Sequence, residues 1–310
     1  MANLETQILD DVIVKSRRKL MTLGATALAG MIVGTSTKEA HAATYNDSDI
    51  LNFALNLEYL EGNFYYLAAF GCTIDAPNAA AKAAGAPTAG IPINKGSVGT
   101  AGTVSGGSKV PFATIAYAAY ANETAIEEGK HVLFLQSALG VSSYVNQPAI
   151  NLGTAWQGLG AALTPSAPTF TPYDNEIDFL LGAYVFEDVG VTAYHGAASL
   201  LTTPAYLAAA AGILGVEAYH AGLVRTAISA IDPAGTGIGA VAQAISTLRA
   251  TLSKAGRLGV AAGPYDSDPD DFGTAPYSVS ITGASYTSTR ITNADPVNSI
   301  AFSRNTTQVL

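Results

Sequence analysis

The stretch GVEAYHAGLVR, residues 215–225, places a glutamate and a histidine three positions apart among alanine, glycine and leucine. Residues at i and i+3 share one face of a helix, so Glu217 and His220 are presented side by side. Burying an acid and an imidazole costs free energy unless a partner offsets their lost hydration. The motif therefore predicts either an exposed pair or a buried binding site.

A second copy of this motif lies upstream, in EEGKH (127–131), where Glu128 and His131 repeat the spacing. Only three histidines and eight glutamates follow residue 42, so random placement seldom produces two such pairs. Glu123 and Glu127 are rotated away from the Glu128–His131 face of the helix, and we expect both to be solvated.

Two further segments with helical periodicity each carry one glutamate among apolar residues. Glu58 lies in LNLEYLEGNFYY (55–66), and Glu187 lies in YVFEDVGVTAY (184–194). One glutamate from each of two helices, with a Glu-x-x-His from each of two others, is the ligand set of dinuclear carboxylate centres in four-helix bundles. We therefore predict a two-metal centre whose ligands are Glu58, Glu128, His131, Glu187, Glu217 and His220.

The composition of this ligand set restricts the metal. Four carboxylates balance the charge of two divalent cations, and two neutral imidazoles complete the coordination. Oxygen-rich ligation with some imidazole suits iron or manganese and leaves positions open for dioxygen or peroxide. The alternative is a bundle whose Glu–His pairs simply face solvent.

Other polar residues near the predicted ligands are candidates for a second shell. Tyr65 and Tyr194 follow Glu58 and Glu187 by seven residues, nearly two helical turns. They are core aromatics, or they hydrogen-bond to ligands or transfer radicals. Glu61 is an outer or alternative ligand, or it is exposed to solvent. Asp188 accepts a hydrogen bond from a ligating imidazole, or it is exposed to solvent. His195 is a packing residue or a third imidazole ligand.

The helical pattern predicts an all-α fold. Four segments are periodic and bounded by Asp, Pro and Gly signals, and a weaker fifth lies at 238–257; the four are 47–71, 111–140, 174–201 and 204–231. The two pairs are separated by a long connection at 141–172. This connectivity predicts a ferritin-like four-helix bundle with a long crossover, an additional C-terminal helix and an irregular C-terminal tail.

The chain divides into three parts on composition. Residues 1–42 are an export segment, residues 43–258 form the bundle with a Gly-rich insert at 72–110, and residues 259–310 form a polar tail that packs on the bundle. Alternation at 277–291 predicts a hairpin. The four aspartates at 266–271 indicate a solvated acidic turn rather than calcium, because the glycine and closing glutamate of an EF-hand loop are missing.

The N-terminus has the pattern of a twin-arginine export signal. Arg17 and Arg18 precede the apolar run TLGATALAGMIVGT (22–35), and the following segment KEAHA (38–42) ends in a small-x-small pattern at Ala40 and Ala42. That run is shorter than the ~20 residues of a spanning helix. We expect its removal and a periplasmic or extracellular protein, and we find no later segment long and apolar enough to span a membrane.

Charge and cysteine content exclude several classes of function. The net charge is −9, which disfavours nucleic acid and anionic membrane as partners. A single cysteine excludes an internal disulfide and a cysteine-based metal site. The expected partner is therefore a small molecule, dioxygen or peroxide.

Four phrases in the chain resemble the exported ferritin-like domain family that includes the plant desiccation-related proteins: LNFALNLEYLEGNFYY, FLLGAYVFEDVGVTAYHGAA, GILGVEAYHAGLVRT and NADPVNSIAFSR. The resemblance implies a bundle with a ferritin-like metal site and does not supply a reaction. Our expectation is redox chemistry on dioxygen or peroxide, ferroxidase-like or catalase-like. The alternative is a stress-protective structural protein whose metal site is vestigial or only stabilising. The long insert and tail oppose assembly into a ferritin shell, and the sequence leaves the oligomeric state open.

Overall fold

The computed structural model describes residues 45–163, 169–256, 273–274, 276–294, 299–304 and 306–309. The predicted export signal and the acidic turn at 266–271 lie outside these residues.

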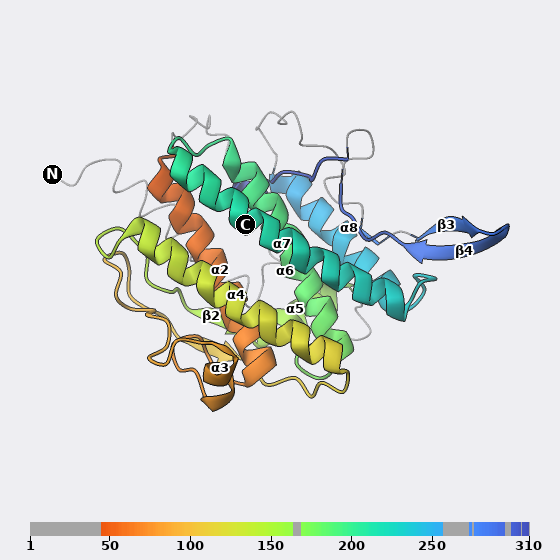
Figure 1. Cartoon of the computed structure of the whole chain (residues 1–310), viewed down its shortest axis with the longest axis horizontal. Coiled ribbons are helices and arrows are strands. Elements are labelled where there is room, and N and C mark those ends of the chain that lie inside the picture. The colour runs from red at the N-terminus through yellow and green to blue at the C-terminus, as the bar shows by residue number, and fades with distance from the viewer. Residues whose placement is uncertain are drawn as a thin grey trace.

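Two pairs of long helices form the bundle (Figure 1). Helix α2 (Asp47–Phe70) packs along α4 (Ile115–Leu139), and α6 (Glu176–Ala198) packs along α7 (Pro204–Ile231). The long connection between α4 and α6 is the predicted crossover. The predicted all-α four-helix bundle is therefore confirmed.

Local capping sets where these helices begin and end. At the start of α2, the Asn46 side chain accepts from the Asp49 N–H, and the Asp49 carboxylate accepts from the Asn46 N–H. The helix ends at Gly71, whose φ of 73° lies in the left-handed region that glycine adopts without strain. Asn175 caps α6 through its side-chain oxygen, and Pro204 occupies the first turn of α7.

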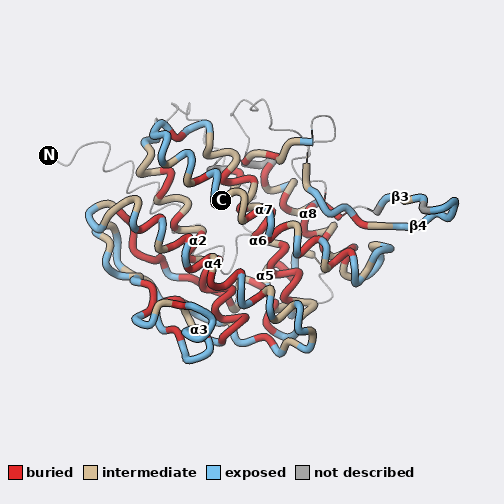
Figure 2. Tube along the Cα trace, in the orientation of Figure 1, coloured by how far each residue is buried: buried red, intermediate tan, exposed pale blue. Residues whose placement is uncertain are grey.

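Aromatic rings fill the core between α2 and α6. The Phe64 ring is fully buried and packs within 6 Å of five other rings, those of Tyr65, Trp156, Tyr173, Phe179 and Phe186. Figure 2 shows the buried residues concentrated along the inward sides of the long helices. Such packing fixes the spacing of the helices that carry the predicted ligands.

The Gly-rich insert at 72–110 contains regular secondary structure. It contains a short helix, α3 (Ala79–Ala84), and a strand, β1 (Val104–Gly106), which pairs in parallel with β2 (Ile150–Leu152) of the crossover. The crossover adds a helix that the sequence pattern did not reveal, α5 (Thr154–Leu163). Insert and crossover therefore brace each other beside the α2–α4 pair.

The C-terminal part packs on the α6–α7 pair. Helix α8 (Ile238–Gly256) is followed by the antiparallel hairpin of β3 (Pro276–Ile281) and β4 (Ala284–Thr289), which confirms the predicted hairpin and projects from the bundle in Figure 1. The chain then returns to α6, where the Arg304 N–H donates to the Thr192 carbonyl, and ends in α9 (Thr306–Val309).

Helix α7 corrects our expectation that no later segment can span a membrane. By length and composition alone it is long and apolar enough to do so. However, its acidic, basic and imidazole side chains, Glu217, Arg225 and His220, are buried, and it packs along α6. Helix α7 therefore turns these polar side chains toward the interior of the bundle, while other parts of its surface stay exposed.

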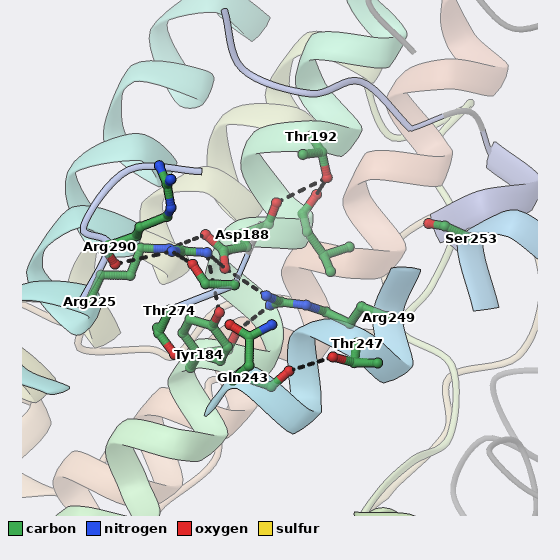
Figure 3. A network of polar contacts seen from close by, with 12 residues as sticks. Tyr184, Asp188, Thr192, Arg225, Gln243, Thr247, Arg249, Ser253, Thr274 and Arg290 are labelled. Carbon is green, nitrogen blue, oxygen red and sulfur yellow. Dashed lines mark hydrogen bonds and ion pairs between the residues drawn. The ribbon is translucent and has the colours of Figure 1, made fainter. Parts of the chain in front are cut away.

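A buried ionic network joins α8 and the tail to the bundle (Figure 3). Asp188 on α6 accepts hydrogen bonds from Arg225 on α7 at 2.6 and 2.9 Å and from Arg249 on α8 at 2.7 Å. Both guanidinium groups also lie over the Tyr184 ring, at 5.1 and 4.5 Å from its centroid. Arg225 further donates to the Gly273 carbonyl. Burial raises the pKa of Asp188, but the two arginines outweigh it and lower the pKa to about 2.

Replacing Asp188 with Asn is expected to lower the free energy of unfolding by about 3–5 kcal/mol, because the two buried arginines lose their counter-charge. Urea denaturation measures the change. Asp75 is exposed, and Asp75→Asn should change stability by less than about 0.5 kcal/mol. Equal stability of Asp188→Asn and wild type would contradict this role for the network.

Candidate metal centre

The six predicted ligands meet inside the bundle. Their ligand atoms form two overlapping groups, and within each group all atoms lie within 4.8 Å of one another. One group is Glu58, Glu128, His131 and Glu217; the other is Glu128, Glu187, Glu217 and His220. Glu128 and Glu217 belong to both, so each group has three carboxylates and one imidazole.

Both histidines turn Nδ1 toward the carboxylates. His131 Nδ1 lies 3.3 Å from Glu58 Oε2, 3.3 Å from Glu128 Oε2 and 3.6 Å from Glu217 Oε1. His220 Nδ1 lies 3.1 Å from Glu128 Oε1 and 3.3 Å from Glu187 Oε2. The i,i+3 spacing of each motif therefore brings its imidazole against carboxylates from neighbouring helices.

The donor atoms fit a cation site because many of them lack a hydrogen-bond partner. All six side chains are buried, and Glu128 and Glu217 are fully so. Within the part of the chain that the structure describes, six buried atoms of this set have no partner in hydrogen-bond geometry, although some lie close to one another: Glu58 Oε2, Glu128 Oε1, Glu187 Oε2, both Glu217 carboxylate oxygens and His220 Nδ1. Buried polar atoms without partners are costly in native proteins. Two divalent cations would give all six atoms a partner and would balance the four carboxylates.

The pKa values of the metal-free centre show how strongly these groups are coupled. Burial raises the pKa of Glu58 to about 7 and that of Glu217 well above its usual range. Burial also opposes charge on Glu128, but the two imidazoles outweigh it and lower its pKa. Burial lowers the pKa of His131, yet Glu58 and Glu128 raise it to about 11. Protons thus supply the positive charge that cations would otherwise provide.

Two tyrosines cross the bundle to hold the outer glutamates. Tyr65 on α2 donates its hydroxyl to Glu187 Oε1 on α6, and Tyr194 on α6 donates to Glu58 Oε1 on α2. Each tyrosine leaves the second oxygen of its glutamate turned toward the histidines. Of the roles that the sequence left open for these tyrosines, the structure shows hydrogen bonding to the predicted ligands.

A family model described as "Ferritin-like domain" matches residues 46–230 of this chain, more than half of its length. The chain belongs to the ferritin-like family. The matched region contains all four bundle helices and all six converging residues, and it ends before α8.

A curated relative supports the same assignment. The desiccation-related protein PCC13-62 of Craterostigma plantagineum is 29% identical over 254 residues, covering 76% of this chain and 74% of the relative. No solved structure matches the chain at a significant level. The predicted resemblance to the family that includes the desiccation-related proteins is therefore confirmed.

Glu61 lies near this ferritin-like centre as a further carboxyl group. We considered solvent exposure for it, but its side chain is buried one turn from Glu58. Burial, followed by the charges of Glu128 and Glu58, raises its pKa well above the usual range. Its oxygens do not belong to either converging group of ligand atoms. Glu61 is thus a further buried carboxyl group beside the centre, and burial favours its protonated form.

Two other second-shell candidates act elsewhere. Asp188 does not hold an imidazole, because its carboxylate pairs with Arg225 and Arg249. The Nδ1 atom of His195 lies 3.0 Å from the Phe302 carbonyl of the tail, so this ring contacts the returning chain rather than the centre. For His195 this is the packing role that we weighed against a third imidazole. Asp188 points away from the centre because neighbouring positions on a helix, here Glu187 and Asp188, point about 100° apart.

Glu127 is the contact that the sequence reading missed. We expected it to be solvated, but its Oε2 atom lies 2.7 Å from His220 Nε2, and its side chain is only 34% exposed. The contact joins α4 to α7, so the helical face of α4 alone could not reveal it. Glu123, one turn earlier, is exposed as expected.

A glycine makes room for the shared carboxylate of Glu217. A Cβ atom added at Gly190 would overlap Glu217 Oε2, whereas a Cβ atom at Gly215 would meet open space. Gly190 lies one turn beyond Glu187 on α6. The absence of a side chain there lets the α7 glutamate reach the middle of the centre.

Replacing Gly190 with Ala is expected to weaken manganese binding by at least about tenfold, because it displaces a carboxylate shared by both ligand groups. The free energy of unfolding should change by less than about 1 kcal/mol, since only the end of a flexible side chain must move. Calorimetric titration and urea denaturation measure the two effects. Gly215→Ala is the control, and equal manganese affinity in both variants would contradict the argument.

Metal-free protein is expected to lose stability as the pH rises from about 5 to about 8. The folded pKa values of Glu58 (about 7) and His131 (about 11) exceed the ordinary values of 4.5 and 6.5 for these side chains. Groups with raised folded pKa values stabilise fully below the unfolded pKa, and this contribution disappears as the pH rises through the folded value. Urea unfolding with a chelator measures the trend. A rise in stability over this interval would contradict the coupling described above.

Proposed function

We propose that this protein holds two iron or manganese ions and uses them in redox chemistry on dioxygen or peroxide, as a ferroxidase-like or catalase-like oxidoreductase. The observation that carries the proposal is the overlap of the two buried ligand groups at Glu128 and Glu217. A single structural cation would need only one such group. Two groups with shared carboxylates suit two neighbouring cations.

The residues divide into three roles in this proposal. Glu128 and Glu217, which belong to both ligand groups, would help to hold both cations. Glu58 with His131 would help to hold one cation, and Glu187 with His220 would help to hold the other. When bound, the metal pair would supply the electron transfer to or from the oxygen substrate. Six protein side chains do not saturate two such ions, so positions stay open for a small molecule.

The two tyrosines that hydrogen-bond to the outer glutamates would keep these ligands in place while the charge of the centre changes. Tyr65 and Tyr194 restrain Glu187 and Glu58 from opposite helices, and burial keeps both hydroxyls protonated by raising their pKa well above the usual range. A protonated hydroxyl is a fixed donor to the carboxylate. This arrangement limits rearrangement of the outer glutamates and favours repeated turnover over loss of metal.

Export is part of the proposal. The twin-arginine pattern at residues 16–42 supports transport to the periplasm or beyond. The negative net charge supports a small-molecule substrate rather than nucleic acid. The insert and tail, which cover one side of each helix pair, oppose packing into a ferritin shell.

A second candidate function is protection of the cell during drying or oxidative stress, with cations that only stabilise the bundle. The desiccation-related relative favours it. In that case metal would raise the melting temperature without turnover. The two candidates therefore differ in activity and agree in metal binding.

Protein loaded with manganese or iron is expected to consume peroxide, or to oxidise ferrous ion with dioxygen, faster than the same concentration of free metal. Glu217→Gln should reduce this rate by at least about tenfold, because it removes a shared carboxylate charge. Peroxide loss and ferric absorbance measure the rates. Glu123→Gln removes an exposed charge from α4 and should keep the wild-type rate.

The outcome also separates the two candidates. Full metal occupancy with a raised melting temperature, but no rate above free metal for either ion, would overturn the oxidoreductase proposal and leave the protective one. Absence of bound metal after saturating addition would overturn both.

A further inference from the structure

The α2–α4 pair and the α6–α7 pair each form one half of the centre, and the two halves carry the same predicted ligands and tyrosines at corresponding positions with one informative difference beside them. Glu58 and Tyr65 on α2 correspond to Glu187 and Tyr194 on α6, and the two Glu-x-x-His motifs correspond on α4 and α7. The residue immediately before the motif differs: it is Glu127 on α4 and Val216 on α7.

Glu127 contacts the imidazole of the opposite motif. Its Oε2 atom lies 2.7 Å from His220 Nε2, while the other ring nitrogen of His220 faces Glu128 and Glu187. A ligating histidine commonly donates its second N–H to a carboxylate, which fixes the ring and makes the ligating nitrogen a stronger donor. His220 has such a carboxylate partner, Glu127.

His131 lacks the same support among the residues that the structure describes. Its ionic contacts all use Nδ1, toward Glu58, Glu128 and Glu217. Val216, at the position that corresponds to Glu127, has no side-chain atom that accepts a hydrogen bond. The His131 side chain is also more exposed, 10% against 3% for His220. The imidazole of this half is therefore less restrained and closer to solvent.

Glu61 does not restore the balance between the two halves. It lies one turn from Glu58, where the other half has Gly190. Its carboxyl group is buried but lies outside both groups of converging atoms, so it completes neither ligand group.

We propose that the two cation positions are inequivalent and that Glu127 is a positioning residue that makes the His220 position the tighter one. This inference rests on the proposed metal binding and adds the order in which the two positions bind their cations. The His220 position fills first and retains its cation, while the His131 position, nearer to solvent, fills second and exchanges more readily.

Calorimetric titration of the metal-free full-length protein with manganese(II) chloride tests this inference. Wild type should show two binding events of different affinity. Glu127→Gln should weaken the tighter event by about 10- to 100-fold and leave the weaker one within about twofold. Glu123→Gln, which removes an exposed charge one turn away on the same helix, should change neither event.

A double-mutant cycle assigns the effect to His220. Glu127→Gln should add no further loss of affinity in a His220→Ala background but should keep its full effect in a His131→Ala background. Two equal binding events in wild type, equal weakening of both events by Glu127→Gln, or additive losses with His220→Ala would each overturn the inference and leave the proposed function standing. Binding of neither manganese nor ferrous ion by wild type would overturn both.

Discussion

Mutual repulsion of buried carboxylates is the constraint around which this bundle is built. Glu58, Glu61, Glu128, Glu187 and Glu217 are all buried in the interior of one protein, where charges are poorly screened. In the metal-free protein, protons on the two imidazoles and on several carboxyl groups relieve the repulsion. Cations would relieve it more completely, because they also pair the oxygen atoms that make no hydrogen bond.

The internal repeat extends beyond the ligands and explains how the added segments attach. The residue that follows the outer glutamate is Tyr59 in the α2–α4 half and Asp188 in the α6–α7 half. The fifth residue after the histidine is Gln136 in the first half and Arg225 in the second. Gln136 donates to Tyr59 and to the Pro92 carbonyl of the insert. Arg225 pairs with Asp188 and donates to the Gly273 carbonyl of the tail.

The same two positions thus became a neutral pair on one half and an ion pair on the other. The neutral pair binds the insert to the outside of the bundle, and the ion pair binds the tail there. Both pairs lie on helices that carry the predicted ligands. The insert on one side and the tail on the other therefore help to hold the ligand-bearing helices at a fixed spacing. The charged pair also joins a third helix, α8, through Arg249, while the Tyr59 hydroxyl of the neutral pair donates to the Val145 carbonyl of the crossover.

The sequence by itself determined the bundle, the crossover and the six converging residues, because helical periodicity and i,i+3 spacing are local properties of the chain. It also determined the tyrosine positions, since seven residues return a side chain to the same face. Only the tertiary structure decided the partners of Glu127, Asp188 and His195, which contact α7, α8 and the returning tail. A side chain's face on its own helix follows from its position in the sequence. The partner it meets depends on which helix packs there, and in this chain those partners lie between 37 and 107 residues away.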